Sequence, residues 1–399
     1  MSRELNSVEL FAGAGGMALG FANAGFKHHT LIEWNCHAFA TLTRNQRSNF
    51  GLIYDGQIYQ ADVRKFDYSQ IGQPIHLVTG GPPCQPFSIG GKHHGKSDKR
   101  DMFPEAVRAV RELKPYGFVF ENVKGLLRKS FGDYLQYIIL QLTYPLMIRG
   151  RDESWEQHLG RLEKIQAQGS GEQLAYNVVL RSLNAANYGV PQTRERIFIV
   201  GFRSDLAIEW SFPEPTHSHE QLLRSKWVTG EYWDQHRIPA AKKPQPPEQY
   251  QRKIEQMRSC PPLFTHQSIS RWQTVRDAIS DLPDPTREAS TTKIPNHELR
   301  LGAKSYPGHT GSLIDQPSKT LKAGDHGVPG GENMLRSPDG SVRYFTVRES
   351  ARLQTFPDDY LIQGSWTESM RQLGNAVPVR LSEIVAGSIY DRLVNCSRV

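Results

Sequence analysis

Cys84 is the residue with the clearest potential for chemistry, because it stands between two proline-containing corners in the segment GGPPCQPFS (80–88). The apolar run IHLVTG (75–80) before it predicts a strand, which places the thiol at the carboxyl end of that strand. The run GFVFEN (117–122) predicts a neighbouring strand that brings Glu121 and Asn122 to the same edge. A thiol beside a carboxyl group that can be protonated suits attack on an electron-poor ring whose nitrogen needs a proton.

Each of these residues also has a plainer interpretation. A single cysteine is often a small buried apolar side chain, and a glutamate at a strand end is often only a solvated cap. Their placement at matching strand ends is what favours catalysis. His93 and His94 invite a metal site, but adjacent histidines near one cysteine lack the usual spacing of zinc ligands, so we expect no metal.

A nucleotide-like cofactor is predicted by the segment VELFAGAGGMALGF (8–21), which has the pattern strand, glycine turn and helix start. Gly13, Gly15 and Ala18 satisfy the G-x-G-x-x-G/A fingerprint of dinucleotide sites. Glu33, at the end of the next strand, is placed to accept hydrogen bonds from ribose hydroxyls, and Trp34 to stack on or wall off an adenine. Asp62 offers a second acceptor. These residues suit NAD and S-adenosylmethionine about equally.

The elements that must position these residues form an α/β pattern. Short apolar runs alternate with helical patterns, which predicts a doubly wound, mostly parallel sheet with ligands at the carboxyl ends of its strands. The expected strands are 7–10, 29–33, 56–60, 75–80, 117–122, 176–183 and 196–202. The expected helices are 16–24, 36–48, 102–114, 131–142 and a terminal apolar helix that begins near Pro378 and packs back on this core.

The chain of 399 residues is long enough for more than one core, and 38% hydrophobic with 22% charged residues is typical of a globular protein. We expect a catalytic and cofactor-binding domain over 1–203, with a surface helix and linker inserted at 149–172. A second, smaller domain rich in loops and short strands follows at 204–345, and 346–399 returns to complete the first. Four scattered cysteines indicate free thiols, and no segment reads as a signal peptide or membrane helix.

The sequence resembles the DNA (cytosine-5)-methyltransferases over nearly its whole length. FAGAGG (11–16) looks like the family's cofactor turn, GGPPCQPFS its Pro-Cys loop and ENVKGLL (121–127) its Glu-Asn-Val motif. QTRERIFIVGF (192–202) looks like its Gln-x-Arg-x-Arg strand, and RESARLQTFPD (348–358) and QLGNAVP (372–378) its two closing motifs. Six ordered motifs at compatible spacings are highly specific, although any one of them could arise by chance.

The resemblance implies a role for each matching residue. Cys84 would be the nucleophile, Glu121 would bind ring nitrogen 3 of the target base, and Arg194 and Arg196 would contact the flipped nucleotide and its phosphate. S-adenosylmethionine is the implied cofactor, and the residues that would bind it are Phe11, Gly13, Gly15, Glu33, Trp34, Asp62, Val63, Asn375 and Val377. For the DNA substrate, we expect contacts from Gln85, Ser88, Lys92, Lys96, Asn122, Lys319, Lys322, Asn333 and Arg336.

Double-stranded DNA is the implied partner, and the formal charge of +7 agrees with a polyanionic substrate. A cytosine inside a duplex cannot reach a thiol at a strand end, so the base must be flipped out. Gly90 and Gly91 would supply hinge freedom to the loop after Cys84, whose basic residues would meet phosphates. The candidate for base readout is the segment 318–340, which is rich in glycine and hydrogen-bond donors.

Several rival functions were weighed against this interpretation. An amino-directed DNA methyltransferase would need an acidic or amide residue beside the prolines, and an NAD oxidoreductase would leave Cys84 and Glu121 without a joint purpose. An RNA cytosine methyltransferase on the same fold and an inactive DNA-binding homologue remain as alternatives; the long segment 204–345 favours DNA, and the intact catalytic set favours an enzyme. We expect a prokaryotic, cytoplasmic monomer that is associated with the nucleoid through its DNA; the sequence leaves open whether it is paired with a cognate restriction endonuclease.

Overall fold

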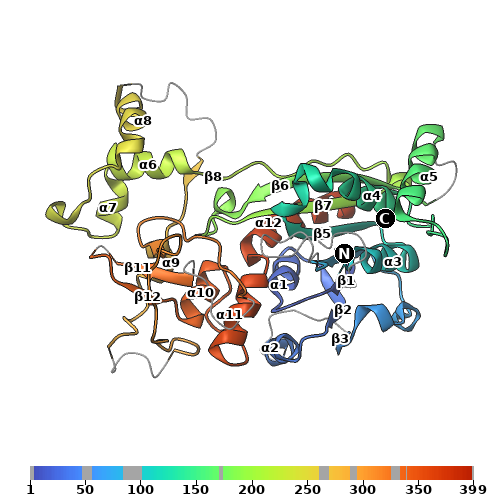
Figure 1. The fold of residues 1–399 in the computed structure, drawn as a ribbon, viewed down its shortest axis with the longest axis horizontal. Helices are drawn as coiled ribbons and strands as arrows, with labels where there is room; N and C mark the ends of the chain where they lie inside the picture. Colours follow the sequence, from blue (N-terminus) through green and yellow to red (C-terminus); the bar gives the residue numbers. More distant parts are fainter. Residues whose placement is uncertain are drawn as a thin grey trace.

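A seven-stranded sheet forms the centre of the larger part of the molecule (Figure 1). The structure is a computed structural model that describes residues 4–46, 56–83, 101–169, 174–259, 269–287, 294–324, 333–337 and 339–397. The strand order is β3-β2-β1-β4-β5-β7-β6, and only β7 runs antiparallel to its neighbours in this sheet. The strands are β1 (Asn6–Leu10), β2 (Lys27–Glu33), β3 (Gln57–Gln60), β4 (Leu77–Gly80), β5 (Gly117–Val123), β6 (Tyr176–Asn184) and β7 (Glu195–Arg203).

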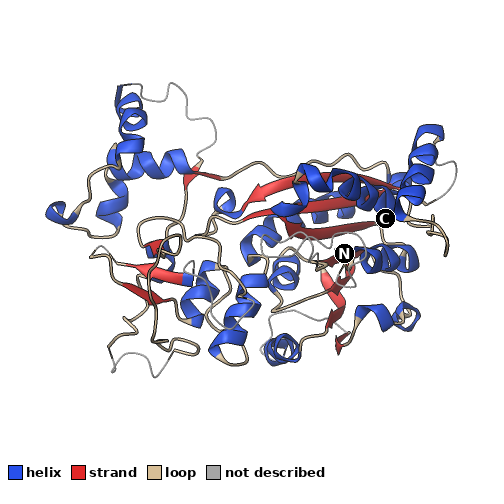
Figure 2. Ribbon diagram, viewed as in Figure 1, coloured by secondary structure: helices blue, strands red, loops and turns tan. Residues whose placement is uncertain are grey.

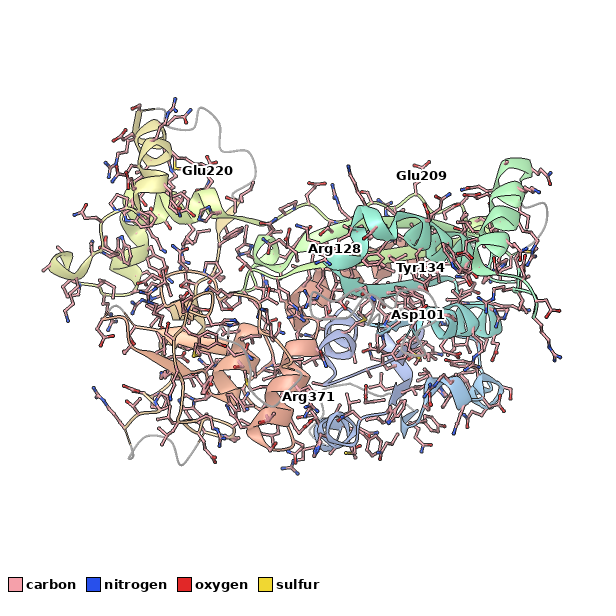
Figure 3. All side chains as sticks on the ribbon, viewed as in Figure 1. Asp101, Arg128, Tyr134, Glu209, Glu220 and Arg371 are labelled. Carbon is pink, nitrogen blue, oxygen red and sulfur yellow. The ribbon has the colours of Figure 1, made fainter. Side chains whose placement is uncertain are left out.

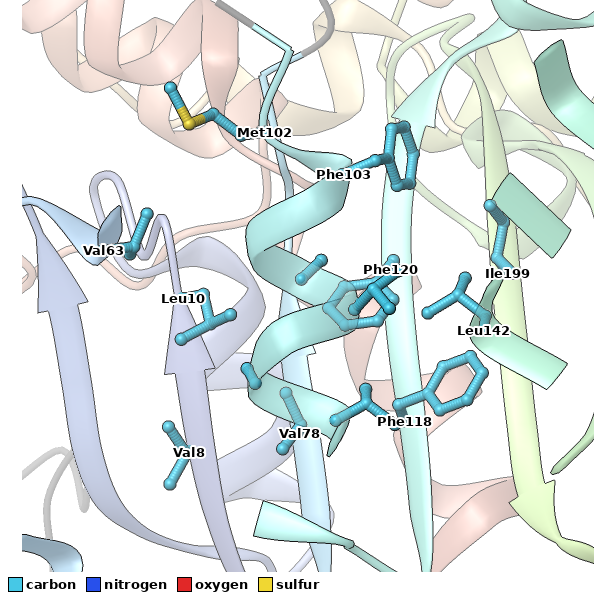
Figure 4. Close-up of a cluster of buried hydrophobic side chains, with 14 of the residues drawn as sticks. Val8, Leu10, Val63, Val78, Met102, Phe103, Phe118, Phe120, Leu142 and Ile199 are labelled. Carbon is cyan, nitrogen blue, oxygen red and sulfur yellow. The ribbon is translucent and has the colours of Figure 1, made fainter. Parts of the chain in front are cut away.

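Helices cover both faces of this sheet, which confirms the predicted doubly wound fold. On one face Phe118 and Phe120 of β5 pack with α3 (Phe103–Leu113) and α4 (Gly132–Thr143), as Figure 4 shows for part of this core. On the other face Val119 packs with α1 (Gly16–Asn23) and α12 (Val379–Val394). Successive residues of β5 point to opposite faces, so the part of the strand that is covered on both sides, Phe118–Phe120, is apolar throughout.

The predicted strands are all present, with ends within two residues of those expected. The predicted helices near the N-terminus match α1, α2 (Cys36–Gln46), α3 and α4 in the same way. The expected surface helix is α5 (Trp155–Gln168), which Ser154 and Gln157 begin with a reciprocal capping box. The terminal apolar helix is α12, and its packing on α1 confirms that the end of the chain returns to the sheet.

The elements between His217 and Tyr344 form a second group of helices and short strands, drawn at the left of Figures 1 and 2, whereas Leu206 and Phe212 before them pack in the core of the large sheet. Its helices were not predicted from the sequence; α6, for example, has few apolar residues of its own and is stabilised by an aromatic cluster that includes Trp227, Tyr232 and Trp233. The helices are α6 (His219–Trp227), α7 (Glu231–Gln235), α8 (Glu248–Ser259) and α9 (Val275–Ile279). The strands are β8 (His217–Ser218), β9 (Ser270–Arg271), β10 (Ser312–Leu313), β11 (Met334–Arg336) and β12 (Val342–Tyr344).

Two further helices, α10 (Val347–Leu353) and α11 (Trp366–Asn375), connect this group to α12. They pack on α1 and α2 through Leu42, Phe356, Tyr360 and Met370. Short 3-10 turns complete the fold: η1 (Val63–Lys65), η2 (Tyr68–Ile71), η3 (Lys124–Leu127), η4 (Lys129–Phe131), η5 (Ala185–Tyr188), η6 (Ser204–Leu206) and η7 (Ala240–Lys242). Within the described residues, no helix has both the length and the hydropathy needed to span a membrane.

The close approach of α1 to α12 can be tested with two glycines. A Cβ at Gly20 of α1 would lie 2.6 Å from the carbonyl oxygen of Val379, whereas a Cβ at Gly387 of α12 meets no described atom within 4 Å. We expect Gly20→Ala to lower the free energy of unfolding by about 1–3 kcal/mol, because overpacking exceeds the gain in helix propensity. Gly387→Ala should be neutral or stabilise by up to about 1 kcal/mol. Urea denaturation measures both values, and equal effects would contradict the close packing.

Candidate active site

A cavity of about 700 Å³ lies at the carboxyl ends of the parallel strands, where the sequence predicted a ligand. Its walls are formed by residues of β1, β2, β5 and β7 and by the segment that follows β4. Helix α11 and the residues directly after this helix close the cavity. The structure therefore brings together in one cavity the two sets of residues that the sequence suggested separately. The predicted residues on its walls are Phe11, Gly13, Glu33, Trp34, Asp62, Val63, Glu121, Asn122, Arg194, Arg196, Asn375 and Val377.

The glycine turn after β1 shapes one end of the cavity. Phe11 and Gly13 have φ values of 56° and 55°, so the backbone turns sharply immediately after the strand. Gly15 is not on the wall; it is the N-cap of α1, with φ 84°, and a Cβ there would lie 2.7 Å from the hydroxyl of Tyr360. The turn thus needs glycine at position 15 both for its left-handed conformation and for the close approach of Tyr360.

Glu33 is held in place at the end of β2 by main-chain donors. Its Oε2 accepts a hydrogen bond from the Gly13 N–H and its Oε1 one from the Asn35 N–H, both at 2.7 Å. Burial raises the pKa of Glu33, and these hydrogen bonds oppose the shift. The carboxylate is therefore oriented before any ligand binds, and its remaining lone pairs can accept from the hydroxyls of a ribose.

Trp34 and Asp62 lie at the rim of the cavity, and both contact Arg64. The sequence did not indicate Arg64 as a site residue. The Arg64 guanidinium lies 5.3 Å from the centroid of the Trp34 ring, and its Nη2 is 2.6 Å from Asp62 Oδ2. Hydrogen bonding to Arg64 lowers the pKa of Asp62. Trp34 is 63% exposed, so one flat apolar surface remains open at this end of the cavity.

Glu121 and Arg196 form a buried ion pair at the opposite end. Arg196 Nε lies 2.9 Å from Glu121 Oε1, and the two side chains come from the adjacent antiparallel strands β5 and β7. Burial raises the pKa of Glu121, although the guanidinium groups of Arg196 and Arg194 oppose that shift. A carboxyl group in this setting can supply a proton to a ring nitrogen, and a guanidinium beside it can stabilise developing negative charge.

Cys84 lies outside the described residues, as do Gln85, Ser88, Lys92 and Lys96. The chain on either side of them is fixed at the cavity. Gly81, Pro82 and Pro83 line its wall, and Asn122 Nδ2 donates to the Pro82 carbonyl at 2.9 Å. Downstream, the Met102 N–H donates to the Pro83 carbonyl at 3.2 Å.

Asp101 anchors the chain just before Met102. Its Oδ1 accepts a hydrogen bond from the Phe103 N–H at 3.2 Å, and its Oδ2 one from the hydroxyl of Tyr134, labelled in Figure 3. The two described ends of the segment that contains Cys84 are therefore held next to each other and beside Glu121.

Arg194 is fully buried and connects three parts of the chain. Its Nη1 donates to the Leu321 carbonyl at 3.1 Å and its Nη2 to the Gly374 carbonyl at 2.7 Å. The side chain thus joins the strand that carries Arg196 to the segment proposed for base readout and to the closing motif. The packing is tight, because a Cβ at Gly374 would lie 2.6 Å from the Cα of Ala323.

The predicted readout residues divide into two groups. Asn333 is buried, and its amide both accepts from the Lys322 N–H and donates to the Lys322 carbonyl, each at 2.9 Å. Lys319 Nζ donates to Thr310 Oγ1 at 3.1 Å, and Arg336 is exposed on β11. Asn333 therefore positions the main chain of this segment, whereas the Arg336 side chain lies at the surface.

Four charged residues on the cavity wall were not predicted from the sequence: Glu9, Arg64, Glu368 and Arg371. Glu9 could have been noticed as the single charge in the apolar strand NSVEL (6–10). Glu368 and Arg371 are paired on α11 with 2.9 Å between Oε1 and Nη1, and Arg371 is labelled in Figure 3. Nothing in their local sequence indicates that this helix closes the cavity, since that depends on the return of the chain from residues 204–345.

Comparisons with known proteins agree with this geometry. The family described as C-5 cytosine-specific DNA methylase matches residues 5–144 and 164–391. The type II methyltransferase M.PspPI of Psychrobacter is 33% identical over 99% of this chain and 81% of its own length. M.Eco47II of Escherichia coli is 32% identical over 97% of this chain and 79% of its own. The crystal structure of the S. pombe Dnmt2 methyltransferase shares the fold, with a TM-score of 0.53 and 17% identity over 98% of each chain.

The connecting role of Arg194 predicts a large effect on stability. We expect Arg194→Met to lower the free energy of unfolding by about 2–4 kcal/mol, because it leaves two buried carbonyl groups without donors. The control is Arg203→Met, which removes a partly exposed pair with Asp205 and should cost no more than about 1 kcal/mol. Chemical denaturation of both variants gives the comparison, and a loss at Arg194 no larger than at Arg203 would contradict the assignment.

Proposed function

The chain belongs to the C-5 cytosine-specific DNA methylase family, and from this premise we propose the reaction that its cavity carries out. The protein is a DNA (cytosine-5)-methyltransferase of the type II restriction-modification class. We propose that it acts on a cytosine flipped out of double-stranded DNA and forms a transient covalent bond to that base through Cys84. The observation that carries this proposal is the buried Glu121–Arg196 pair in the same cavity as the glycine turn, beside the prolines that lead to Cys84.

The cavity fits S-adenosylmethionine, which when bound supplies a methyl group on a sulfonium. Glu33 is preoriented for ribose hydroxyls, and Trp34 offers an open ring for a base. Phe11 and Gly13 would contact the middle of the cofactor, and Asn375 and Val377 would close over it from the C-terminal segment. A volume of about 700 Å³ holds both this cofactor and one nucleobase.

The chemistry requires a nucleophile because carbon 5 of cytosine does not accept a methyl group readily. The Cys84 thiolate adds to carbon 6 while Glu121 hydrogen-bonds or protonates nitrogen 3, which turns the ring into an enamine whose carbon 5 is nucleophilic. Arg196 stabilises the charge that builds on the ring. After transfer, a base removes the proton of carbon 5, and the pair of electrons released expels Cys84 as a thiolate.

The DNA is held by parts of the chain that meet at this cavity. We propose that residues 204–345 form the target-recognition domain and that 346–399 complete the catalytic domain of 1–203. The segment 318–324 supports this, because Thr193 N–H donates to the Ser318 carbonyl at 2.8 Å and Thr320 Oγ1 to the Thr193 carbonyl at 2.7 Å. Base readout and the target-base pocket are therefore connected through residues 193 and 194.

The comparisons favour DNA over RNA as the substrate, since the matching family is described as DNA-directed and the relatives are type II methyltransferases. We further propose that the protein acts as a monomer in the cytoplasm, on the DNA of the nucleoid. The type II class of its relatives supports a functional pairing with a cognate restriction endonuclease.

The nucleophile is tested directly with Cys84→Ala. We expect methyl transfer to fall by ~10⁴-fold or more, because no other group can form the adduct. With DNA that carries 5-fluorocytosine at the methylated position, the unaltered protein should form a covalent complex and Cys84→Ala should not. Cys396→Ala, at a partly buried cysteine near the C-terminus, is the control and should retain full activity. Trapping by Cys84→Ala would overturn the mechanism.

The raised pKa of Glu121 predicts a pH dependence. If the protonated carboxyl assists attack, kcat of the unaltered enzyme falls as the pH rises through this pKa. Glu121→Gln should lower kcat by about 10²–10⁴-fold and remove that decline at high pH, since its amide cannot lose a proton in this range. Single-turnover rates between pH 6 and 9 measure both effects, and an unchanged pH profile in Glu121→Gln would exclude Glu121 as the proton donor.

A further inference from the structure

Glu9 is a buried carboxyl group that the reaction described above does not use. It is 1% exposed, lies on β1 two residues before Phe11, and forms part of the cavity wall. In the sheet it stands directly beside Thr79 of β4, whose hydroxyl donates to Glu9 Oε2 at 3.1 Å. The main chain of Ala18 in α1 lies close enough to Glu9 to favour its ionised form.

The groups that face Glu9 include no partner cation among the residues that the structure describes. Glu33 on β2 adds a like charge, and Tyr360, from the segment between α10 and α11, faces it with its hydroxyl bound to the Ala14 carbonyl at 2.6 Å. His28 on β2 is neutral, because burial lowers its pKa to about 4. On β5, Glu121 is paired with Arg196. Burial raises the pKa of Glu9 to about 8, although Thr79 and Ala18 oppose the shift.

The strand order places Glu9 between the two ends of the cavity. Across the sheet the sequence of strands is β2, β1, β4 and β5, so β1 lies between Glu33 at one end and Glu121 at the other. In the proposed reaction the ribose lies at Glu33 and the target base at Glu121. The sulfur that passes on its methyl group would then lie between them, over β1 and β4, the two strands that Glu9 and Thr79 occupy.

We propose that Glu9 is a specificity-determining residue that distinguishes the cationic methyl donor from its uncharged thioether product, by releasing its proton when a sulfonium binds. The inference rests on the proposed function, because it needs S-adenosylmethionine in this cavity. A positive charge placed near a buried neutral carboxyl favours the carboxylate, since few water molecules screen the pair. The proton goes to solvent, and Glu9 takes one back when methyl transfer has left an uncharged sulfur.

The consequence follows from linkage. If the sulfonium favours the carboxylate, the carboxylate must favour the sulfonium by the same factor. S-adenosylmethionine and S-adenosylhomocysteine differ only by the methyl group and the positive charge on sulfur, and the contribution of the methyl group to binding does not change with pH. At low pH the Glu9 carboxyl group is neutral, and the pocket should not distinguish the charged ligand from the uncharged one. Above pH 8 Glu9 is ionised, and S-adenosylmethionine should be preferred. The affinity for S-adenosylmethionine relative to S-adenosylhomocysteine should therefore rise with pH. The full rise is about tenfold for each unit by which the bound sulfonium lowers the pKa of Glu9.

Titration calorimetry without DNA tests this on the full-length protein. S-adenosylmethionine and S-adenosylhomocysteine are titrated at pH 6.5, 7.5 and 8.5, in buffers of low and high ionisation enthalpy. We expect proton release near pH 7 with the sulfonium only, and an affinity ratio that rises at least about tenfold over this range. Glu9→Gln should release no proton and show a flat ratio, with the thioether affinity within about twofold of the unaltered value.

Two controls keep the outcomes distinct. Glu4→Gln, at an exposed carboxylate near the start of the chain, should leave proton release unchanged. Infrared difference spectra of the unaltered protein should lose the carbonyl band of a protonated carboxyl with the sulfonium and keep it with the thioether, which tests the idea even if Glu9→Gln does not fold. A pH-independent ratio, or proton release that persists in Glu9→Gln, would overturn the role of Glu9. Failure of both ligands to bind would instead refute the proposed cofactor.

Discussion

The buried ion pair between Glu121 and Arg196 is the constraint on which the rest of the site depends. Removing two charges from water is costly, and the cost is recovered only where the partners are held at close range. Here the antiparallel pairing of β5 with β7 holds the two side chains close together, because it sets Val123 opposite Arg196. Arg196 Nε then lies 2.9 Å from Glu121 Oε1. The one strand that breaks the parallel pattern of the sheet is therefore the strand that delivers Arg196 to the cavity.

A second set of contacts holds this pair in relation to the remainder of the chain. Arg194, two residues before Arg196, binds the main chain at Leu321 and Gly374. Gln192 accepts from the Leu321 N–H at 3.2 Å, and Asn333 holds both main-chain groups of Lys322. Side chains beside β7 thus bind the main chain of the segment proposed for base readout. A displacement of this segment would therefore disturb Arg194 and the cavity wall to which it belongs.

The cofactor end of the cavity is built on different principles. Its shape comes from a backbone turn at Phe11 and Gly13 and from the close approach of the C-terminal segment to α1. Its electrostatics come from carboxyl groups in three states: Asp62 paired with Arg64, Glu33 bonded to main-chain donors, and Glu9 buried without a cation among the described residues. Of these three carboxyl groups, Asp62 is neutralised by its ion pair with Arg64, and burial favours the neutral form of Glu9.

The sequence alone was sufficient for the elements whose pattern is local. The strands and the glycine turn followed from apolar runs and from the spacing of Gly13 and Gly15, and the family motifs indicated Glu121, Arg196 and Glu33, which the structure places in one cavity. The roles of these residues in binding and catalysis remain proposals, and Cys84 itself lies outside the described residues.

Only the tertiary structure decided what depends on contacts between distant segments. The helix α6 forms because Trp233 and Tyr232 pack on it, Arg371 reaches the cavity because α11 returns to the sheet, and Asn333 is occupied by the main chain of Lys322. The protonation of Glu9 likewise follows from burial, which strand periodicity does not reveal. The reason is physical: periodicity and turn chemistry act between residues close in sequence, whereas burial, ion pairing and closure of a cavity are set by whatever the fold brings within a few ångströms.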